Sequence, residues 1–344
     1  MSISNKQHHT VVTCFPLSAT QKKSLKHRLT KLEKQLSARF DIIFSSDDAI
    51  DQDILQANIF CGHAKVPVPW PQVVRQGKLR WIQSTAAGLD HCLVSEVVAS
   101  NILVSGCSGL FAIQVAEQTL ALLTGLIRRT PVFFRAQQLR QYERRPTDNL
   151  FNKSVGILGM GGNGQQIARV LRPLVKQIVA TDLFEDYCQR FLDLQQIDEF
   201  IPVNHWKRML SSVDVLIVTL PLSASNNNLI GTAELDAMKQ GSYLINVGRG
   251  SVVNSDALYR SLEQGKLAGA GIDVVEPEPL PADSPLWNLN NIMITPHVGA
   301  QSPSRVPLTI DLFLQNVQRF CQNQTLWNVV DKQLGFPRPE HRLC

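Results

Sequence analysis

The sequence lacks CxxC pairs and zinc-type cysteine spacings, although seven of its 344 residues are cysteines. This absence argues against a structural zinc site, and the odd number argues against a complete disulfide framework. We predict reduced, mostly buried thiols of a cytoplasmic protein, and no bound metal. The cysteines are Cys14, Cys61, Cys92, Cys107, Cys188, Cys321 and Cys344.

Long hydrophobic runs are also missing. The most apolar segment, residues 115–127, contains Glu117 and Gln118 and is too short to cross a bilayer. The first ten residues do not have the charged-then-apolar order of a signal peptide. We therefore expect a soluble protein without a membrane partner.

Neither sign of charge dominates strongly. The 34 Lys and Arg residues against 29 Asp and Glu residues give a net charge of +5. The densest basic stretch, residues 22–34, has helical spacing with Leu25, Leu29 and Leu32 on one face. This pattern favours a solvated helix surface over a nucleic-acid patch, so we expect no nucleic-acid partner. A mildly basic protein does suit a small anionic substrate.

Length and patterning favour two folded α/β domains. The chain is too long for one ordinary core, and its 44% apolar and 18% charged residues indicate globular structure throughout. Short apolar runs alternate with helical patterns, which predicts two Rossmann-like, doubly wound parallel sheets. The predicted strands cover residues 11–15, 40–44, 59–61, 80–84 and 102–105, then 155–159, 178–181, 213–220, 242–247, 268–274 and 291–295.

Two predicted helices mark the division between the domains. We place the boundary at the helix at 112–129, which is followed by a polar, charged stretch at 137–149. The helix at 304–322 follows the last strand and returns to the first domain. The first domain is thus discontinuous, with residues 1–111 and 300–344, and the second comprises residues 112–299. The tail at 335–344, with two prolines and several charges, is predicted to be an arm on the surface.

A glycine-rich segment follows the predicted strand at 155–159. Gly159, Gly161 and Gly164 form the spacing GxGxxG between this strand and a helix. In that context Gly159 permits a tight turn, Gly161 lets backbone amides approach a pyrophosphate, and Gly164 lets the helix pack closely on the strand. The helix N-terminus adds unpaired N–H groups and a partial positive charge. The segment therefore predicts a dinucleotide site.

An acidic residue, Asp182, ends the next predicted strand, 18 residues beyond Gly164. Its carboxylate can bind both hydroxyls of a ribose and would repel a 2′-phosphate. Leu183 and Phe184 offer no cation to receive such a phosphate. These residues favour NAD over NADP. The alternative, a glycine-rich turn followed by a surface aspartate, is disfavoured by strand, spacing and acid together.

Three later strands are each followed by residues suited to reducing a 2-keto acid. Open α/β sheets bind ligands at the carboxyl ends of their strands. Arg249 can bind a carboxylate and a carbonyl oxygen through two parallel hydrogen bonds. His297 can donate the proton, because imidazole titrates near neutral pH, and Glu278 would orient it and favour its charged form. Each residue alone also fits a structural role, but together they predict hydride-transfer chemistry.

Seven motifs resemble the D-isomer-specific 2-hydroxyacid dehydrogenase family, in the family's order. This family includes D-lactate dehydrogenases, glyoxylate/hydroxypyruvate reductases and phosphoglycerate dehydrogenases. The resemblance runs from about Leu79 to Ser302. The motifs are RWIQSTAAGLDH, VAEQTLALL, GILGMGGNG, VTLPL, NVGRGSVV, GIDVVEPEPLP and TPHVGA.

The resemblance implies a role for each candidate catalytic residue. Arg249 matches the substrate-binding arginine, His297 the general acid/base, and Glu278 the acid that pairs with the histidine. Backbone groups of Ala87 and Gly88 match the loop that binds the substrate carboxylate.

The resemblance also implies an NAD-binding domain inserted in a discontinuous substrate domain, and a homodimer built on the helix between them. Asp273 matches the residue that holds the nicotinamide amide. The implied cofactor-binding residues are Gly159, Gly161, Gly162, Asn163, Gly164, Asp182, Leu220, Pro221, Val247, Gly248, Asp273 and Gly299.

The sequence leaves the substrate open within a small 2-keto or 2-hydroxy acid, with glyoxylate or hydroxypyruvate favoured. The segment around Cys61 lacks the arginine of phosphoglycerate enzymes, and no further domain is expected after residue 320, so phosphoglycerate is a weaker alternative. An NAD-sensing protein similar to the family's corepressors is another. A formate-type dehydrogenase is disfavoured, because those members resemble this chain but carry Gln where Glu278 stands. Asn226 replaces a common Thr, so that cofactor contact is expected to differ.

Overall fold

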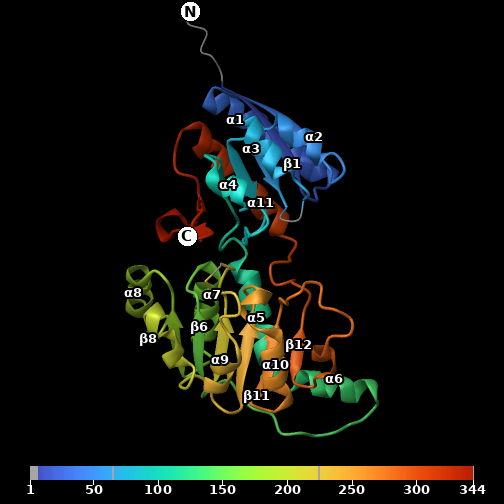
Figure 1. The fold of residues 1–344 in the computed structure, drawn as a ribbon, viewed down its shortest axis with the longest axis vertical. Helices are drawn as coiled ribbons and strands as arrows, with labels where there is room; N and C mark the ends of the chain where they lie inside the picture. The colour runs from blue at the N-terminus through green and yellow to red at the C-terminus, as the bar shows by residue number, and fades with distance from the viewer. Residues whose placement is uncertain (1–6, 64–65, 224, 344) are drawn as a thin grey trace, which may run out of the picture. The chain divides into compact units, whose positions relative to one another are not determined.

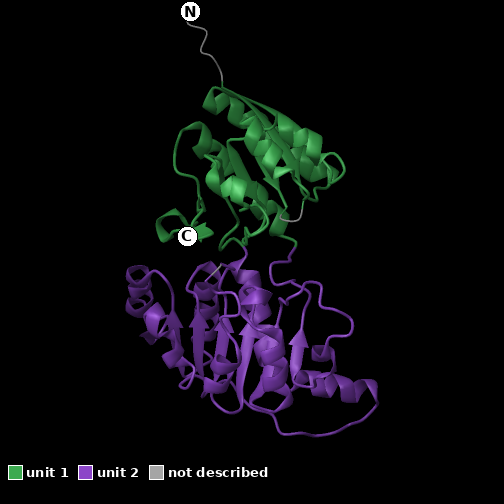
Figure 2. Cartoon of the chain, in the orientation of Figure 1, with its two compact units in different colours: residues 1–110, 303–344 green, residues 111–302 purple. Residues whose placement is uncertain are grey.

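The computed structural model describes residues 7–63, 66–223 and 225–343. The chain forms two compact units, residues 1–110 with 303–344, and residues 111–302 (Figure 2). Each unit contains one parallel sheet covered by helices on both faces, which confirms the predicted α/β fold class. Among the described residues, no helix is both long enough and apolar enough to cross a membrane.

Unit 1 contains a five-stranded parallel sheet of order β2-β1-β3-β4-β5 (Figure 1). One face packs against α1 and α11 through residues such as Leu25 and Phe313, and the other packs against α2, α3 and α4. The helix α1 begins with a capping box formed by Ser18 and Gln21. The elements are β1 (Gln7–Cys14), α1 (Ala19–Leu36), β2 (Ala38–Phe44), α2 (Ile50–Asp53), β3 (Ile59–Gly62), α3 (Trp70–Gln76), β4 (Trp81–Ser84), α4 (Ser95–Ala99), β5 (Leu103–Ser105) and α11 (Arg305–Cys321).

The end of the chain packs onto unit 1, so the prediction of a surface arm is wrong for the described part of the tail. Strand β14 (Phe336–Pro337) pairs with β13 (Val330–Asp331), and Arg342 is buried. The buried amide of Asn328 accepts a hydrogen bond from the backbone N–H of Leu343. The charges and prolines of the tail predicted that it is exposed, but these backbone hydrogen bonds hold it against unit 1. Cys344 lies outside the described residues.

Unit 2 contains a seven-stranded parallel sheet of order β12-β11-β10-β9-β6-β7-β8. Helices α5, α7 and α8 pack on one face, and α9 and α10 pack on the other. The strand order reverses between β6 and β9, which is the switch point where such sheets bind ligands. The elements are α5 (Ala112–Ile127), α6 (Thr130–Gln138), β6 (Ser154–Leu158), α7 (Gly162–Leu171), β7 (Gln177–Thr181), α8 (Glu185–Asp193), β8 (Glu199–Phe200), β9 (Val215–Val218), α9 (Thr232–Ala237), β10 (Ser242–Asn246), α10 (Ser255–Glu263), β11 (Leu267–Ile272) and β12 (Ile292–Ile294).

The helix predicted at 112–129 ends two residues early. Arg129 adopts a left-handed conformation with φ of 54°, and Pro131 follows in the first turn of α6. This bend starts a second helix instead of extending the first. From α6 the chain runs through residues 139–149 along the outside of unit 2 and returns to β6 (Figure 1).

Candidate active site

The predicted cofactor residues all follow strands of the seven-stranded sheet. The loops after β6, β7, β9, β10, β11 and β12 share one edge, because all these strands are parallel. Leu220 and Pro221 follow β9, Val247 and Gly248 follow β10, and Gly299 follows β12. Unit 2 therefore gathers these residues at the edge where its switch point lies.

The three fingerprint glycines have different surroundings. Gly159 has φ of 98°, which favours glycine. A Cβ on Gly164 would lie 1.9 Å from the carbonyl oxygen of Gly159, so this position allows no side chain. A Cβ on Gly161 would meet no atom within 4 Å. Gly162 and Asn163 form the start of α7 directly beyond it. The loop thus leaves open space in front of a helix N-terminus, which fits a pyrophosphate.

Asp182 joins the glycine-rich loop to the end of β7. Its Oδ2 accepts a hydrogen bond from the backbone N–H of Met160 at 2.6 Å, and its Oδ1 accepts one from Phe184 at 3.0 Å. An ionised carboxylate has about four acceptor sites, so two remain for ribose hydroxyls. These remaining acceptor sites fit the hydroxyls of an adenosine ribose.

Arg249 lies in a tightly packed turn after β10. The amide of buried Asn246 accepts a hydrogen bond from the Gly248 N–H at 3.1 Å and donates one to the Arg249 carbonyl at 3.0 Å. A Cβ on Gly250 would lie 2.0 Å from the Val275 carbonyl oxygen, and one on Gly248 would lie 2.6 Å from that of Leu220. Close backbone packing on both sides therefore fixes where the arginine leaves the loop.

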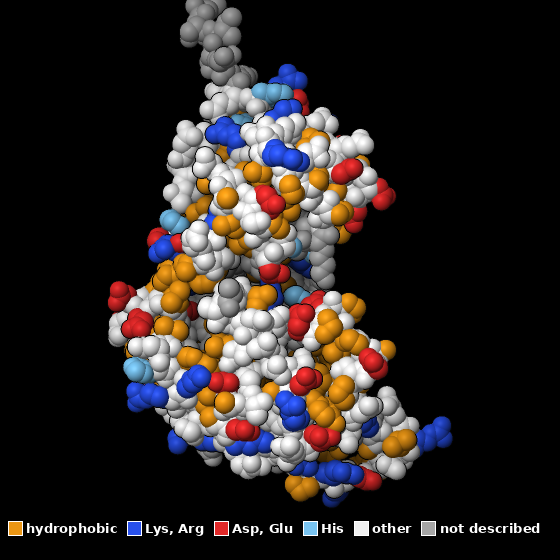
Figure 3. All heavy atoms as spheres, in the orientation of Figure 1, with side chains coloured by type: hydrophobic (Ala, Val, Ile, Leu, Met, Phe, Trp, Pro, Cys, Tyr) orange, Lys and Arg blue, Asp and Glu red, His pale blue; other side chains and the backbone are white. Residues whose placement is uncertain are grey.

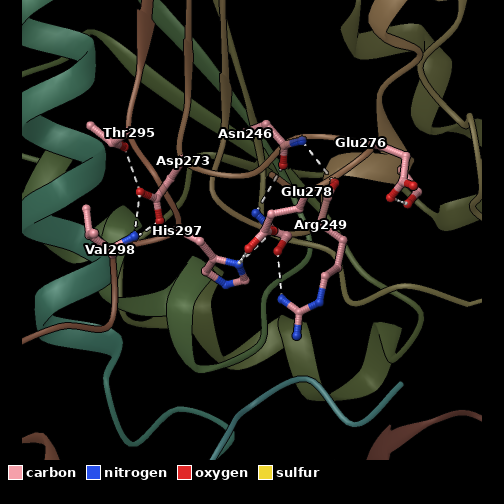
Figure 4. A network of polar contacts seen from close by, with 11 residues as sticks. Asn246, Arg249, Asp273, Glu276, Glu278, Thr295, His297 and Val298 are labelled. Carbon is pink, nitrogen blue, oxygen red and sulfur yellow. Dashed lines mark hydrogen bonds and ion pairs between the residues drawn. The ribbon is translucent and has the colours of Figure 1, made fainter. Parts of the chain in front are cut away.

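Glu278 and His297 form an ion pair in front of these strand ends. The His297 Nδ1 lies 3.2 Å from Oε1 and 3.1 Å from Oε2 of Glu278. The side chain of His297 is 41% exposed and that of Glu278 is 33% exposed, so the pair is open to solvent on one side. Figure 4 shows the Arg249 side chain extending in the same direction as the imidazole, with Glu278 beside both. Because Nδ1 faces Glu278, the imidazole Nε2 is directed away from this carboxylate.

Asp273 is the buried centre of the neighbouring loop, with an exposure of 3%. Its Oδ1 accepts hydrogen bonds from the Thr295 hydroxyl at 2.6 Å and the Val298 N–H at 3.0 Å, and its Oδ2 accepts one from Gly299 at 2.8 Å. Gln118 on α5 donates to the Thr295 hydroxyl at 2.9 Å. These contacts occupy most of the carboxylate's acceptor sites.

The loop after β9 carries the expected departure at Asn226. Its side-chain amide donates to the Pro221 carbonyl at 2.6 Å and accepts from the Ser223 N–H at 2.8 Å. Asn226 therefore closes the loop that follows Leu220.

Ala87 and Gly88 belong to unit 1, in the loop that follows β4. Ala87 is exposed, and the N–H of Ala86 donates to the Ser84 hydroxyl at 3.1 Å. Beneath the loop, buried Gln83 accepts a hydrogen bond from Ser105 at 2.8 Å and donates one to the Ser84 carbonyl at 3.0 Å. Buried hydrogen bonds thus fix the base of the loop, and its tip at Ala87 is exposed.

Sequence reasoning missed the residues that hold the site in place. Asn246, Thr295 and Gln118 were not assigned a role, although they lie within the quoted motifs NVGRGSVV, TPHVGA and VAEQTLALL. A polar residue at the buried end of a strand is the signal that could have identified them. The described residues contain no group of three or more His, Cys, Asp or Glu side chains that could hold a metal ion.

Comparison with known proteins identifies the family. A family model described as D-isomer specific 2-hydroxyacid dehydrogenase, NAD binding domain, matches residues 120–299, more than half of the chain. This chain belongs to the D-isomer specific 2-hydroxyacid dehydrogenase family. The resemblance found in the motifs is thereby confirmed, and the reaction class is hydride transfer between a nicotinamide cofactor and a 2-hydroxy or 2-keto acid.

Relatives of this dehydrogenase cover most of its length. A human protein named glyoxylate reductase/hydroxypyruvate reductase is 30% identical over 243 residues, covering 69% of this chain and 72% of its own. A family member of known structure from Aeromonas salmonicida subsp. salmonicida A449 is 27% identical, with a TM-score of 0.76, covering 95% of this chain and 99% of its own. An NADPH-dependent glyoxylate/hydroxypyruvate reductase from Sinorhizobium meliloti, in complex with NADP and malonate, has 24% identity and a TM-score of 0.74, covering 96% and 99%. At 24% identity, the similarity to the Sinorhizobium meliloti structure shows a common fold and nothing more.

Proposed function

We propose that this dehydrogenase reduces a short 2-keto acid of the glyoxylate or hydroxypyruvate type, giving the D-isomer where the product is chiral, with NADH as the hydride donor. The observation that carries the proposal is the Glu278–His297 pair, 3.1 Å apart, with Arg249 extending from the adjacent strand end. The name of the human relative supports the substrate class.

The proposed cofactor is NAD, held by unit 2, with unit 1 supplying the substrate-carboxylate loop at Ala87 and Gly88. Two features of unit 2 support it. The space beside Gly161 fits a pyrophosphate, and the carboxylate of Asp182 keeps acceptor sites for ribose hydroxyls while repelling a 2′-phosphate. When bound, the nicotinamide would supply the hydride to the carbonyl carbon.

The roles proposed for the three side chains follow from their chemistry. The Arg249 guanidinium binds the substrate's carboxylate and polarises its carbonyl oxygen, with a charge that does not change near neutral pH. The His297 Nε2 donates its proton to the oxygen as negative charge develops there. Glu278 accepts the Nδ1–H, which keeps the ring oriented.

The test is NADH oxidation with glyoxylate, hydroxypyruvate, pyruvate and 3-phosphohydroxypyruvate, each repeated with NADPH. We expect the first two acids to be reduced fastest and NADH to be preferred. His297→Asn should lower kcat about 10²- to 10⁴-fold, the contribution typical of general acid catalysis. Glu278→Gln should lower kcat and leave NADH binding intact.

Three outcomes would overturn parts of the proposal. Inactivity with every acid would reject the reductase, a preference for the phosphorylated acid would reject the substrate, and a preference for NADPH would reject NAD. A matched control is Glu263→Gln, because Glu263 is exposed on α10 and is hydrogen-bonded to Tyr259. This variant should behave as wild type.

The oligomeric state, the class of partner and the location are proposed from three further observations. We propose a homodimer, supported by the exposed apolar side chains along α6 and the segment that follows it. On the face of unit 2 seen in Figure 3, basic and acidic side chains are interspersed, which favours a small-molecule substrate over nucleic acid. The six described cysteines are free and five are buried, which supports a cytoplasmic location.

A further inference from the structure

His297 has a backbone conformation that other contacts must maintain. Its φ of 55° lies in the left-handed region, which is unfavourable for a residue with a side chain. Its own N–H donates to the carbonyl oxygens of Asp273 at 2.7 Å and Thr295 at 3.0 Å. The direction of the imidazole therefore depends on the turn that these hydrogen bonds close.

Asp273 binds three successive amides of that turn. Its carbonyl accepts the N–H of His297, and its two carboxylate oxygens accept those of Val298 and Gly299. Gly299 is required for this approach, since a Cβ there would lie 2.8 Å from Oδ2. Asp273 thus holds the amide of His297 through its carbonyl and the next two amides through its carboxylate.

The carboxylate is itself held from outside the loop. The Thr295 hydroxyl donates to Oδ1 at 2.6 Å, and Gln118 donates to that hydroxyl at 2.9 Å. Accepting from Gln118 leaves the hydroxyl hydrogen directed at the carboxylate. The Gln118–Thr295–Asp273 series therefore runs from α5, through the end of β12, to the turn that carries His297 (Figure 4 draws its last step).

We infer that Gln118 and Thr295 are positioning residues for His297, acting through the carboxylate of Asp273. The inference rests on the proposed function, because it assigns His297 the proton transfer. Without the Thr295 hydroxyl, Asp273 loses a donor that orients it, and the turn is free to relax from its left-handed conformation. The imidazole then leaves its alignment with Glu278 and with the substrate oxygen.

The first experiment compares kcat, the keto-acid KM and the Kd for NADH in wild type and three variants. Thr295→Val should lower kcat about 10- to 100-fold, the loss typical of a misplacement of about 1 Å, and should change the NADH Kd by a smaller factor, since Asp273 is also assigned to the cofactor site. Thr295→Ser keeps the hydroxyl and should restore kcat. Thr119→Val is the matched control, since buried Thr119 on α5 bonds only its own helix, at the Val115 carbonyl. An unaltered kcat in Thr295→Val would overturn the inference.

A double-mutant cycle separates positioning from general loss of structure. In an enzyme that already carries His297→Asn, adding Thr295→Val should change kcat by less than about twofold, because the group it positions is gone. Losses that multiply would show that Thr295 acts elsewhere and would reject the inference. Gln118→Leu should follow the same pattern with a smaller effect.

Hydrogen exchange tests the positioning without relying on turnover. Amides 298 and 299 should exchange faster in Thr295→Val than in wild type or Thr119→Val, since the carboxylate that accepts from them is less well held. If wild type reduces no keto acid and this difference persists, the proposed function fails while the positioning stands. If wild type is active and the exchange is unchanged, the positioning fails alone.

Discussion

Gly161 and Gly164 lie three residues apart in one loop, yet their replacement should have opposite consequences. The space beside Gly161 is open, whereas a Cβ on Gly164 would overlap the Gly159 carbonyl oxygen. Gly161→Ala should change the free energy of unfolding by only a few tenths of a kcal/mol to about 1 kcal/mol, as expected at a helix N-cap. It should weaken NADH binding at least about tenfold, because the methyl group fills the space proposed for the pyrophosphate.

Gly164→Ala should instead destabilise unit 2 by about 1–3 kcal/mol, because α7 must move away from the loop. Urea unfolding and NADH fluorescence titration of both variants measure the two effects. Equal stability losses, or tight NADH binding by Gly161→Ala, would contradict the assignment of these positions.

Sequence reasoning at the residue scale found the groups that carry distinctive chemistry. Arg249, Glu278 and His297 were identifiable because a guanidinium, a carboxylate and an imidazole followed successive strands. Asn246 and Thr295 were not, because their importance depends on which backbone groups lie opposite them. Those partners are set by the packing of neighbouring loops, which a single sequence does not specify.

Strand β1 contains the clearest pH-sensitive element of unit 1. His9 is buried between Phe40 and Phe320, with ring centroids 5.7 Å from each, and neither of its ring nitrogens has a hydrogen-bond partner among the described residues. Burial lowers the pKa of His9 below its usual 6.5, and Arg80 and His8 lower it further. The folded state thus holds this imidazole neutral at a pH where the unfolded chain binds a proton.

The stability that His9 provides should therefore be present above pH 6.5 and be lost as the pH falls from there towards its lower folded-state pKa. One proton contributes a slope of at most about 1.4 kcal/mol per pH unit. His9→Phe should remove this contribution and flatten the fall in unfolding free energy between pH 7 and 5. His27→Gln is the control, because His27 is exposed on α1 and does not contribute to the pKa shift of His9. Urea unfolding across this range measures the slopes, and identical slopes in wild type and His9→Phe would refute the account.

Element prediction succeeded where burial imposes a long apolar pattern. The alternation of strands and helices indicated both sheets; β10 lies within its predicted range, and β6 begins one residue before its own. The two-residue β8 is too short to produce a pattern, so it was missed. The end of α5 depended on the left-handed Arg129, a conformation that nothing in its side chain requires.

At the scale of the whole molecule, α6 and residues 139–151 expose apolar side chains that no other part of the chain covers among the described residues. Phe134, Leu139, Tyr142 and Phe151 are all exposed, Tyr142 to 96%. The segment is held at both ends. Arg135 donates a hydrogen bond to the Leu289 carbonyl at 2.8 Å, and the Lys153 Nζ lies 2.6 Å from the Asp148 Oδ2. Apolar side chains on an anchored segment mark an interaction surface.

A second copy of the chain should cover this surface. Light scattering after size exclusion should give twice the chain mass, and Phe134→Glu with Leu139→Glu should yield a folded monomer, because two carboxylates would be desolvated in the interface. We expect the dimer Kd to rise at least about 10²-fold, or about 2.8 kcal/mol. Leu194→Glu is the matched control, since Leu194 is equally exposed at the end of α8, away from this segment in the sequence. A wild-type monomer, or a dimer that persists in the double variant, would show that another surface or none is used, whereas dissociation by Leu194→Glu alone would move the interface to α8.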